Sequence, residues 1–377
     1  MSDVPAPGRA GQGRPRWPSL TGLIARRGFQ KWAARFPLTR RKVRREGEAL
    51  FDLLAGFCHS QVLMALVQLD IPKTLLDAPT TARALSARTG VPDDRMLVLL
   101  NAGIALGLLK QRRDARFAVT ARGAALVGVP GLQEMIRHHD VLYRDLADPV
   151  AFFRGETETE LAGFWPYVFG GDVDTDVAQT YSDLMAQSQL LVADDTLDAV
   201  DLSGVSHLLD VGGGTGAFLS EVGRRHGKMT LTLFDLPAVA PHAAARFARE
   251  GLTPRSRIVT GSFRTDPLPT GADAVSLIRV LYDHTDATVS DLLAKVFETL
   301  PPGGRLIVSE PMSGGATPQR AGDAYFAIYT MAMGTGQARS AQRIAEMCRV
   351  AGFAQVHQPR SRRPFVTSTV IAVKAAR

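Results

Sequence analysis

One short stretch, HLLDVGGGTGAF (His207–Phe218), carries the residue types and spacing that most clearly predict chemistry. An apolar run ends at Asp210, glycines stand at positions 212, 213, 214 and 216, and apolar residues of helical period follow. Glycine allows the backbone to turn with positive φ, and main-chain N–H groups at the start of a helix bind polar ligand groups. The stretch therefore predicts a strand, a ligand-binding turn and a helix.

Two kinds of cofactor fit such a turn, and Asp210 favours one of them. Gly212, Gly214 and Ala217 satisfy the dinucleotide pattern G-x-G-x-x-A, in which a pyrophosphate lies at the helix N-terminus. A carboxylate two residues before the first glycine would face the mouth of the turn, where it repels a diphosphate but can receive the ammonium group of an amino acid. The pattern D-x-G-x-G-x-G, completed by Gly216, therefore favours S-adenosylmethionine.

Short apolar runs alternate with helical lengths from residue 201 onward, which is typical of a parallel, doubly wound sheet. After the first strand, the expected strands are 231–235, 257–261, 272–280, 305–310 and a last one within 365–376. Ligands of such sheets lie at the carboxyl ends of the strands. The residues expected there are Asp210, Asp235, Gly261, Arg279, Tyr282 and Glu310. Asp235 is spaced from the glycines so that its carboxylate can accept hydrogen bonds from both ribose hydroxyls.

The chain has 377 residues, 45% of them hydrophobic, which is enough for two globular domains. Its net charge of +7 is unevenly placed, because the first 45 residues carry 12 of the 44 Lys and Arg but one of the 37 Asp and Glu. Residues 1–45 are therefore predicted to be a basic, largely disordered arm on a slightly acidic body. Basic and aromatic residues mix from Leu20 to Arg45, so this arm could contact an anionic lipid surface, stay solvated or cross a dimer.

Residues 46–130 show a helical pattern followed by a short strand and turn, FAVTARG, which is typical of a winged-helix domain. Many such domains bind DNA through a helix that presents Arg, Lys or Asn to bases and phosphates. The helix expected within residues 92–109 instead begins with acidic residues and is apolar along its length. We therefore expect this domain to contact a partner subunit and no nucleic acid.

Residues 131–200 are expected to link the two domains and to contribute to a substrate pocket. Aromatic residues cluster at Phe164, Trp165, Tyr167 and Phe169 in a chain that is only 7% aromatic. This cluster is either a packed corner or the wall of an apolar pocket. His138 and His139 are adjacent, so they point to different sides of a helix and do not form a metal pair. We expect no metal site.

Two features bear on where the protein is found. Cys58 and Cys348 lack C-x-x-C spacing, which indicates two buried free thiols in a reducing compartment. The N-terminus has no apolar segment typical of a secretory signal, and no run approaches the roughly 20 apolar residues that span a bilayer. The protein is therefore expected in the cytoplasm, with a peripheral contact to a membrane surface left open.

The motifs of the second half, taken together, resemble one family. DVGGGTG, FDLP, GSF with DPLP, IRVLYDHTD and LPPGGRLIVSEPM are similar to the successive motifs of small-molecule O-methyltransferases of the caffeic acid and acetylserotonin type. The resemblance covers residues 46–377. It implies an α/β fold in which a seven-stranded, doubly wound, Rossmann-like methyltransferase domain at 201–377 follows a mostly helical winged-helix dimerisation domain at 46–130. It also implies a homodimer.

The same resemblance implies which residues hold S-adenosylmethionine. The methionyl and ribose parts would lie at Gly212 and Asp235, and the adenine would lie by Ser262 and Phe263. Arg279 would stand near the cofactor where many relatives have lysine. The full expected set is Asp210, Gly212, Gly214, Gly216, Asp235, Leu236, Gly261, Ser262, Phe263 and Arg279.

Four further segments, MIRHHDVLYRDLADPVAFFRG, ELAGFWPYVFG, ADDTLDAVDL and YFAIYTMAMG, resemble the carotenoid-methylating members of this family. They imply methyl transfer to the tertiary 1-hydroxyl of an acyclic carotenoid such as demethylspheroidene or hydroxyneurosporene. The substrate contacts expected on these segments and nearby are His138, His139, Phe164, Trp165, Tyr167, Tyr329 and Met333. A phenol, a polyketide or a bacteriochlorophyll precursor stays open as another apolar acceptor.

The catalytic motif departs from the family pattern. Where plant and animal relatives have H-D-W with histidine as the general base, this chain has Tyr282, Asp283 and His284. Tyrosine, with an ordinary pKa of about 10, suits the orienting of a hydroxyl, whereas histidine at about 6.5 is the better base. On an extended segment, residues 282 and 284 would share one side. Glu310 matches the family acid that orients the base.

The departure leaves other functions open. Some relatives of this fold keep the cofactor but catalyse decarboxylation or hydroxylation, and loss of the family histidine admits that chemistry here. A winged-helix regulator that senses the cofactor is the alternative that is not an enzyme, although the chain lacks a basic recognition helix.

Overall fold

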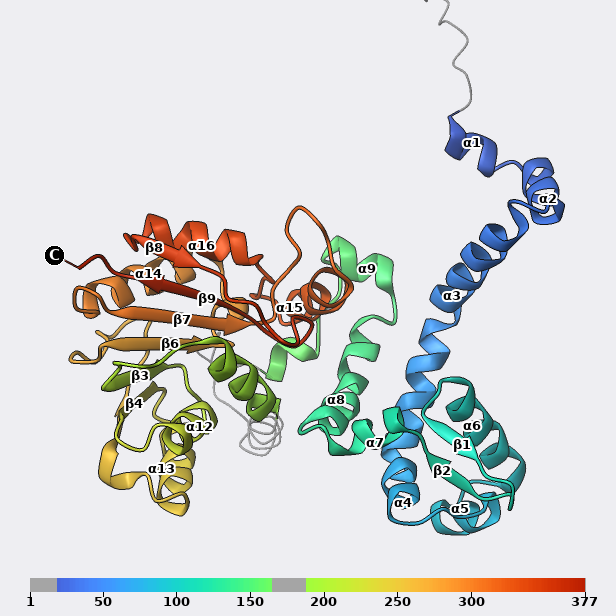
Figure 1. The fold of residues 1–377 in the computed structure, drawn as a ribbon, viewed down its shortest axis with the longest axis horizontal. Helices are drawn as coiled ribbons and strands as arrows, with labels where there is room; N and C mark the ends of the chain where they lie inside the picture. Colours follow the sequence, from blue (N-terminus) through green and yellow to red (C-terminus); the bar gives the residue numbers. More distant parts are fainter. Residues whose placement is uncertain (1–18, 165–187, 377) are drawn as a thin grey trace, which may run out of the picture. The chain divides into compact units, whose positions relative to one another are not determined.

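The computed structural model describes residues 19–164 and 188–376 of the chain. It divides into two compact units, Met1–Ala65 and Leu66–Arg377. Figure 1 shows the described elements coloured along the sequence.

The described part of the first unit is helical. It contains α1 (Leu20–Ile24), α2 (Arg27–Arg35) and most of α3 (Arg40–Gln68), which runs through the predicted boundary at residue 45. The Ser19 hydroxyl accepts a hydrogen bond from the N–H of Gly22 at 3.1 Å and caps α1. The predicted disorder is therefore wrong for residues 19–45, because Arg, Lys and Ala favour helices and the cap stabilises the first one. Residues 1–18 lie outside the described residues.

Helix α3 presents apolar side chains to solvent in this single chain. Leu50, Phe51, Leu53, Leu54 and Phe57 are each 64–73% exposed. The helix is long and apolar enough, by length and composition alone, to cross a membrane, with a mean hydropathy of 1.6 over 18 residues. The prediction that no run approaches this length is therefore wrong, because Asp52 and a few polar residues interrupt the run without making its mean hydropathy low. Cys58 lies on this exposed helix, so its predicted burial is also wrong, whereas Cys348 is buried.

The second unit begins with a small set of helices and a strand pair. They are α4 (Ile71–Asp77), α5 (Ala82–Thr89), α6 (Asp93–Ala105), β1 (Leu109–Gln111), β2 (Phe117–Val119) and α7 (Ala121–Gly128). Strands β1 and β2 pair antiparallel, which is the helix-then-strand order that the sequence predicts. Asp70, with a left-handed φ of 51°, separates α3 from α4, and Pro72 lies in the first turn of α4.

Three helical segments follow: α8 (Leu132–Asp145), α9 (Pro149–Arg154) and the 3-10 turn η1 (Leu161–Phe164). The buried Asp145 carboxylate accepts hydrogen bonds from the N–H groups of Glu160 at 2.7 Å and Leu161 at 3.1 Å. It therefore ties the start of η1 to the end of α8. Apolar residues of α8 and α9 pack with a later helix, α15 (Ala327–Ala332), in one cluster. Residues 188–199 are also helical.

A seven-stranded sheet forms the core of the second unit, in the order β5-β4-β3-β6-β7-β9-β8. Its strands are β3 (His207–Val211), β4 (Thr230–Asp235), β5 (Ser256–Thr260), β6 (Ala274–Ile278), β7 (Arg305–Glu310), β8 (Gln355–His357) and β9 (Ser368–Val373). The strands β3 to β7 pair in parallel, and β9 lies antiparallel between β7 and β8. The predicted doubly wound sheet is confirmed. The short strand β8 is not among the strands predicted from apolar runs.

Helices cover both faces of this sheet (Figure 1). Those on one face are α14 (Asp286–Thr299) and α16 (Ala341–Val350), and those on the other are α12 (Ala217–Arg225) and α13 (Ala240–Arg249). Successive strand residues point to opposite faces, so Leu208 and Leu209 enter different apolar clusters. Short turns of 3-10 type lie at η2 (Thr253–Arg255) and η3 (Leu281–Asp283), and a π-helical turn, η4 (Gly322–Phe326), precedes α15. Because β3, β4, β6 and β7 run parallel, the turns that follow these strands lie at the same edge of the sheet.

Candidate functional site

The glycine turn after β3 has the predicted backbone conformation. Gly212, Gly214 and Gly216 have φ values of 69°, 58° and 75°. A Cβ added to Gly213 would lie 2.3 Å from Oδ2 of Asp210, whereas nothing lies within 4 Å of one added to Gly214. The turn is thus closed toward the sheet and open at Gly214, which fits a ligand lying against the backbone.

Asp210 lies beneath this turn. Its side chain is fully buried, and Oδ1 accepts a hydrogen bond from the Ser276 hydroxyl at 2.6 Å. Oδ2 has no hydrogen-bond partner among the described residues. Burial raises the pKa of this carboxyl to about 7, and the nearby charge of Asp235 acts in the same direction. A buried acceptor without a partner, beside an open glycine, fits the ammonium group of an amino-acid ligand.

Asp235 ends β4 and reaches back to the same turn. Its Oδ2 accepts a hydrogen bond from the N–H of Gly214 at 2.7 Å, and its Oδ1 accepts one from the N–H of Leu236 at 2.7 Å. Burial raises the pKa of the carboxyl, and these two N–H donors act against that shift. Each carboxylate oxygen still has a second lone pair, so ribose hydroxyls can donate to a group that is already held in place.

The turn after β5 holds the next group of predicted residues. The N–H of Ser262 donates to Oδ2 of Asp266 at 2.8 Å, and the ammonium of Lys295 donates to the Phe263 carbonyl at 2.7 Å. A Cβ on Gly261 would lie 2.8 Å from the Phe234 ring, so the turn approaches β4 closely. Together these contacts fasten the turn to β4 and to α14.

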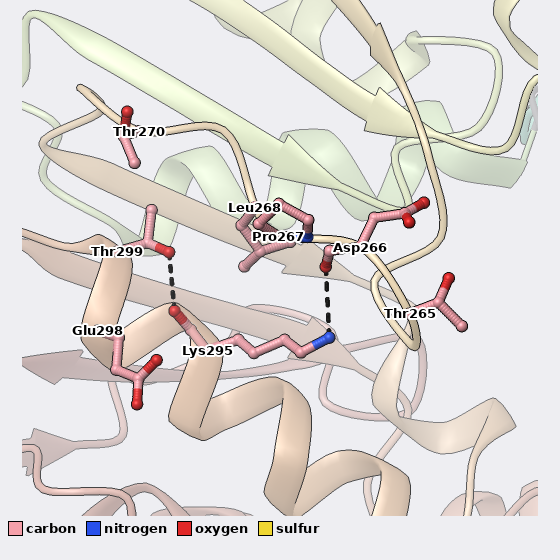
Figure 2. A pocket seen from close by; sticks show the side chains of 8 residues that line it. All are labelled: Thr265, Asp266, Pro267, Leu268, Thr270, Lys295, Glu298 and Thr299. Atoms are coloured by element: carbon pink, nitrogen blue, oxygen red, sulfur yellow. Dashed lines mark hydrogen bonds between the residues drawn. The ribbon is translucent and has the colours of Figure 1, made fainter.

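A surface hollow lies behind this turn. Figure 2 shows its lining, which comprises Thr265, Asp266, Pro267, Leu268, Thr270, Lys295, Glu298 and Thr299. None of the predicted site residues lines the hollow. The Lys295 side chain crosses the hollow and donates to the Asp266 carbonyl at 3.3 Å. We therefore interpret these lining residues as structural support for the turn after β5.

Arg279 and Tyr282 follow β6 at the same edge of the sheet. Arg279 has a φ of 58°, a conformation that a residue with a side chain rarely adopts. Its guanidinium donates to the Ser188 hydroxyl at 2.8 Å and approaches the Tyr282 hydroxyl at 3.5 Å. Tyr282 is buried, and burial raises the pKa of its phenol above the ordinary value of 10. The phenol is therefore protonated, so it can orient a hydroxyl but cannot act as the resting base.

Glu310, at the end of β7, holds the backbone of the turn that contains Tyr282. Its Oε2 accepts a hydrogen bond from the N–H of Tyr282 at 3.1 Å. Its Oε1 has no partner among the described residues, and the same is true of Oδ1 of Asp283. Burial raises the pKa of Glu310 to about 7 and raises that of Asp283 well above its usual range. No described contact joins Glu310 to the His284 ring or to the Tyr282 hydroxyl.

His284 faces a different part of the site from Tyr282. The expectation that the two share one side is wrong, because it assumed an extended segment, whereas Tyr282 lies in a 3-10 turn that ends at Asp283. The His284 ring packs edge-on against Phe263 at 5.2 Å, and its Nδ1 lies 3.2 Å from the Arg264 guanidinium. Burial, with the charges of Arg264 and Arg339, lowers its pKa to about 4.

The contact with Arg264 constrains the chemistry of His284. A guanidinium can only donate, so Nδ1 is the acceptor and Nε2 carries the proton of the neutral ring. The one lone pair that could take a proton therefore already faces a cation. This arrangement suits a positioning role beside the Ser262–Phe263 turn better than the role of a general base.

The predicted substrate residues of α8 and α15 meet in two histidine–tyrosine pairs. Nε2 of His138 lies 3.1 Å from the Tyr329 hydroxyl, and Nε2 of His139 lies 2.7 Å from the Tyr325 hydroxyl. Burial lowers the pKa of His138 to about 4 and also lowers that of His139, so both rings are neutral near pH 7. Met333 is buried with Tyr329 in the apolar cluster of α8, α9 and α15.

Tyr325 was not among the predicted site residues. A signal was available, because Tyr325 and Tyr329 are spaced i, i+4 and share one helical face. The side chain of Phe164, together with Trp165 and Tyr167, lies outside the described residues, so the predicted aromatic wall stays a prediction. Among the residues that the structure describes, no cluster of three or more His, Cys, Asp or Glu side chains is placed to hold a metal ion.

Comparisons with known proteins agree with this geometry. Residues 143–354 match the family model of the O-methyltransferase domain, and residues 51–128 match that of the O-methyltransferase dimerisation domain. The chain is 54% identical to the demethylspheroidene O-methyltransferase of Cereibacter sphaeroides over 376 residues, 99% of each chain. It is also 54% identical over 340 residues to the protein of that name from Rhodobacter capsulatus, which covers 90% of this chain and 85% of that one.

Solved structures show the same fold. The crystal structure of human N-acetylserotonin methyltransferase in complex with S-adenosylmethionine superposes with a TM-score of 0.73 at 24% sequence identity. The likeness covers 88% of this chain and 98% of that one.

Proposed function

Because this chain belongs to the O-methyltransferase family, we propose that it transfers the methyl group of S-adenosylmethionine to the tertiary 1-hydroxyl of an acyclic carotenoid such as demethylspheroidene or hydroxyneurosporene. The observation that carries the acceptor is the likeness over nearly the whole chain to demethylspheroidene O-methyltransferase. The cofactor supplies a methyl group on a positively charged sulfur, which is already activated for displacement. The protein therefore contributes alignment of the hydroxyl, exclusion of water and a path for its proton.

The residues at the edge of the sheet fit this cofactor. Oδ2 of Asp210 is the buried acceptor that an ammonium group would satisfy, and the open face of Gly214 leaves room for a ligand. Asp235 would accept hydrogen bonds from the ribose, and Leu236 with Gly261, Ser262 and Phe263 would surround the adenine. Gly212 and Gly216 supply the left-handed turns, and Arg279 would stand beside the cofactor.

The three residues predicted for catalysis have orienting or positioning roles in this proposal. The protonated phenol of Tyr282 donates a hydrogen bond to the acceptor hydroxyl and orients it for attack. Glu310 holds the N–H of Tyr282 and so fixes the turn that carries the phenol. His284 packs against Phe263 and shapes the adenine side of the site.

The acceptor side suits a long apolar substrate. Its polar groups are neutral histidine and tyrosine side chains, and they lie beside a buried apolar cluster. We propose that His138, His139, Tyr329 and Met333 line the acceptor pocket together with Phe164, Trp165 and Tyr167. No charged group is needed to recognise a tertiary alcohol on a hydrocarbon chain.

The dimerisation domain that matches residues 51–128 supports a homodimer. We further propose that this cytoplasmic enzyme contacts an anionic membrane surface through residues 19–45. Leu20, Ile24, Trp32 and Leu38 are exposed there by 48–84%, among basic side chains and no acidic one. Apolar side chains with a basic surround fit an interfacial contact, and a carotenoid is itself a membrane lipid.

The decisive experiment measures methyl transfer from labelled S-adenosylmethionine to detergent-solubilised 1-hydroxy carotenoids, with a simple phenol as a second acceptor. Methylation of the carotenoid is the expected result. Methylation of the phenol alone would keep the cofactor site and reject the carotenoid. Cofactor binding without transfer to either would reject both acceptors and favour a different reaction on the same fold.

A further inference from the structure

The residues predicted for catalysis leave the acceptor's proton without a destination. Tyr282 is a buried, protonated phenol, and the free lone pair of His284 faces the Arg264 guanidinium. Glu310 accepts a hydrogen bond from the N–H of Tyr282, and no contact among the described residues joins it to a catalytic side chain. A methylated tertiary alcohol must nevertheless lose its proton, so another group has to accept it.

The pair formed by Tyr325 and His139 has the contact that such a role requires. The Tyr325 hydroxyl lies 2.7 Å from Nε2 of His139, and the two rings meet edge-to-face at 5.5 Å. The companion pair, His138 and Tyr329, is longer at 3.1 Å, and Tyr329 is only 4% exposed, whereas Tyr325 is half-buried. Tyr325 is therefore the more accessible phenol of the two.

The backbone around Tyr325 supports a functional position. Tyr325 lies in the π-helical turn η4, and π-turns are rare and occur often at functional sites. A Cβ on Gly322 would lie 2.2 Å from the Met312 carbonyl, so the start of the turn is pressed against the chain after β7. The Asp323 carboxylate accepts hydrogen bonds from the N–H groups of Gly314 and Gln319, both at 2.7 Å. These contacts hold Tyr325 near the edge of the sheet.

Charged and titratable groups surround the Tyr325–His139 pair on several elements. His138 and Tyr143 lie beside His139 on α8, Tyr325 faces it from η4, and Tyr329 lies 6.1 Å from the Tyr325 ring. The Arg279 guanidinium at the end of β6 lowers the pKa of Tyr325 against the effect of burial. Arg279 therefore interacts electrostatically with Tyr325 and also contacts the Tyr282 hydroxyl.

We propose that Tyr325 is a catalytic residue that takes the proton of the acceptor hydroxyl while it passes its own proton to Nε2 of His139. This inference rests on the proposed methyl transfer to a hydroxyl, and it names the residues that complete it. In this step His139 takes no proton directly from the acceptor and acts through Tyr325.

The step balances in atoms and electrons. The acceptor oxygen forms a bond to the methyl carbon as the sulfur–methyl bond breaks, with its electron pair left on sulfur. The acceptor's proton moves to the Tyr325 oxygen, and the Tyr325 proton moves to Nε2 of a neutral His139 that carries its other proton on Nδ1. His139 then releases the proton to solvent. The net result is one methyl group moved from sulfur to the acceptor oxygen and one proton released.

The first test compares Tyr325→Phe with Tyr143→Phe, a matched loss of a phenolic hydroxyl from a second tyrosine beside His139. We expect kcat of Tyr325→Phe to fall by about 100-fold, the lower range for loss of general base catalysis, with the Kd of S-adenosylmethionine and the Tm unchanged. Tyr143→Phe should keep the kcat of the wild type. Full activity of Tyr325→Phe, or an equal loss in both variants, would overturn the proposal.

The second test reads the proton on His139 without using activity. The chain has eight histidines, and a difference spectrum against His139→Gln identifies the imidazole signals of His139 in ¹⁵N NMR of the free wild-type protein. We expect a neutral ring at pH 7 with its proton on Nδ1, and a shifted Nε2 signal in Tyr325→Phe. A ring that carries its proton on Nε2 would be a donor to Tyr325, and the relay would be rejected even if Tyr325→Phe failed to fold.

The third test is the pH profile of kcat. Because burial lowers the pKa of His139, the wild type should stay active until the pH falls below the ordinary imidazole value of 6.5 and then lose activity as His139 is protonated. His139→Gln should be slow and should lack this acidic limb, whereas His138→Gln should keep it. An unchanged limb in His139→Gln would contradict the proposal.

If the wild type methylates no hydroxyl at all, the proposed function fails instead, and the NMR result still decides the proton position.

Discussion

The cofactor side and the acceptor side of the site are built in different ways. On the cofactor side, Asp210 and the glycine turn lie within a few residues of one another, and the backbone itself offers the ligand contacts. On the acceptor side, each histidine–tyrosine pair joins residues 186 or 191 positions apart in the sequence. The cofactor side therefore depends on local backbone geometry, and the acceptor side depends on the packing of α8 against η4 and α15.

The two sides also differ in charge. The cofactor side buries carboxyl groups whose pKa values are raised, as in Asp210 and Asp235. The acceptor side buries histidines whose pKa values are lowered and tyrosines whose pKa values are raised, so its groups are neutral. One side can thus meet a cationic amino acid, and the other a hydrocarbon with a single hydroxyl.

The largest effect on cofactor binding is expected at Gly213, where an added Cβ would meet a neighbouring side chain most closely. In Gly213→Ala the new Cβ would lie 2.3 Å from Asp210 Oδ2 and 2.4 Å from Leu233 Cδ1, so the turn must move. We expect S-adenosylmethionine affinity to fall more than 100-fold and the free energy of unfolding to drop by about 1–3 kcal/mol, measured by calorimetry and thermal unfolding. Gly227→Ala, where nothing lies within 4 Å, is the matched control. Wild-type affinity in Gly213→Ala would break the contrast between the sides.

A smaller and purely kinetic effect is expected at the junction of the two sides. Tyr282→Phe removes one hydroxyl near Arg279 and leaves the Glu310 contact with the backbone. We expect kcat to fall about 10- to 100-fold, the worth of one hydrogen bond to a charged or reacting group, with unchanged cofactor affinity. His284→Ala should lower turnover less, because its lone pair already faces Arg264. If His284→Ala cost more than Tyr282→Phe, His284 would be the base after all.

The opposite pKa shifts of Asp210 and His138 predict opposite effects of pH on the stability of the folded protein. Asp210 has a folded pKa of about 7 against an ordinary 3.8, so its contribution to stability is complete below pH 3.8 and is lost as the pH rises through 7. His138 has a folded pKa of about 4 against 6.5, so its contribution is complete above pH 6.5 and is lost as the pH falls through 4.

Chemical unfolding of the ligand-free protein between pH 4 and 7 measures this difference. Asp210→Asn should make stability rise more steeply with pH, and His138→Gln should make it rise less steeply. Each change is bounded by about 1.4 kcal/mol per pH unit for one group. Equal signs in the two variants would contradict the assignment of charge to the two sides.

The smallest effect on the site should come from the basic arm, which belongs to neither side. Trp32 is 51% exposed and stacks on Phe36 at 4.9 Å. Trp32→Ala should weaken sedimentation with vesicles of anionic lipid, have little effect with neutral lipid, and leave kcat on a detergent-solubilised acceptor unchanged. Phe365→Ala removes a similarly exposed aromatic from the second unit and should change neither. Equal vesicle binding by both variants and the wild type would contradict the proposed membrane contact of residues 19–45.

Much of the fold and the cofactor side could be predicted from the sequence. Glycine spacing, Asp210 and Asp235 lie in short motifs whose backbone conformation follows from residue type, and buried parallel strands appear as apolar runs. The three-residue strand β8 carries too short an apolar signal to be found in this way. The helices of residues 19–45 were missed because a basic composition is shared by disordered segments and exposed helices.

The acceptor side could be predicted only in part. The family resemblance predicted that His138, His139 and Tyr329 belong to one region, and the local residue types predicted the cofactor turn. Only the tertiary structure paired His139 with Tyr325, turned His284 toward Arg264 and left Oδ2 of Asp210 without a partner. The physical reason is that a side-chain hydrogen bond depends on how distant helices and turns pack, and neither residue type nor local spacing specifies that packing.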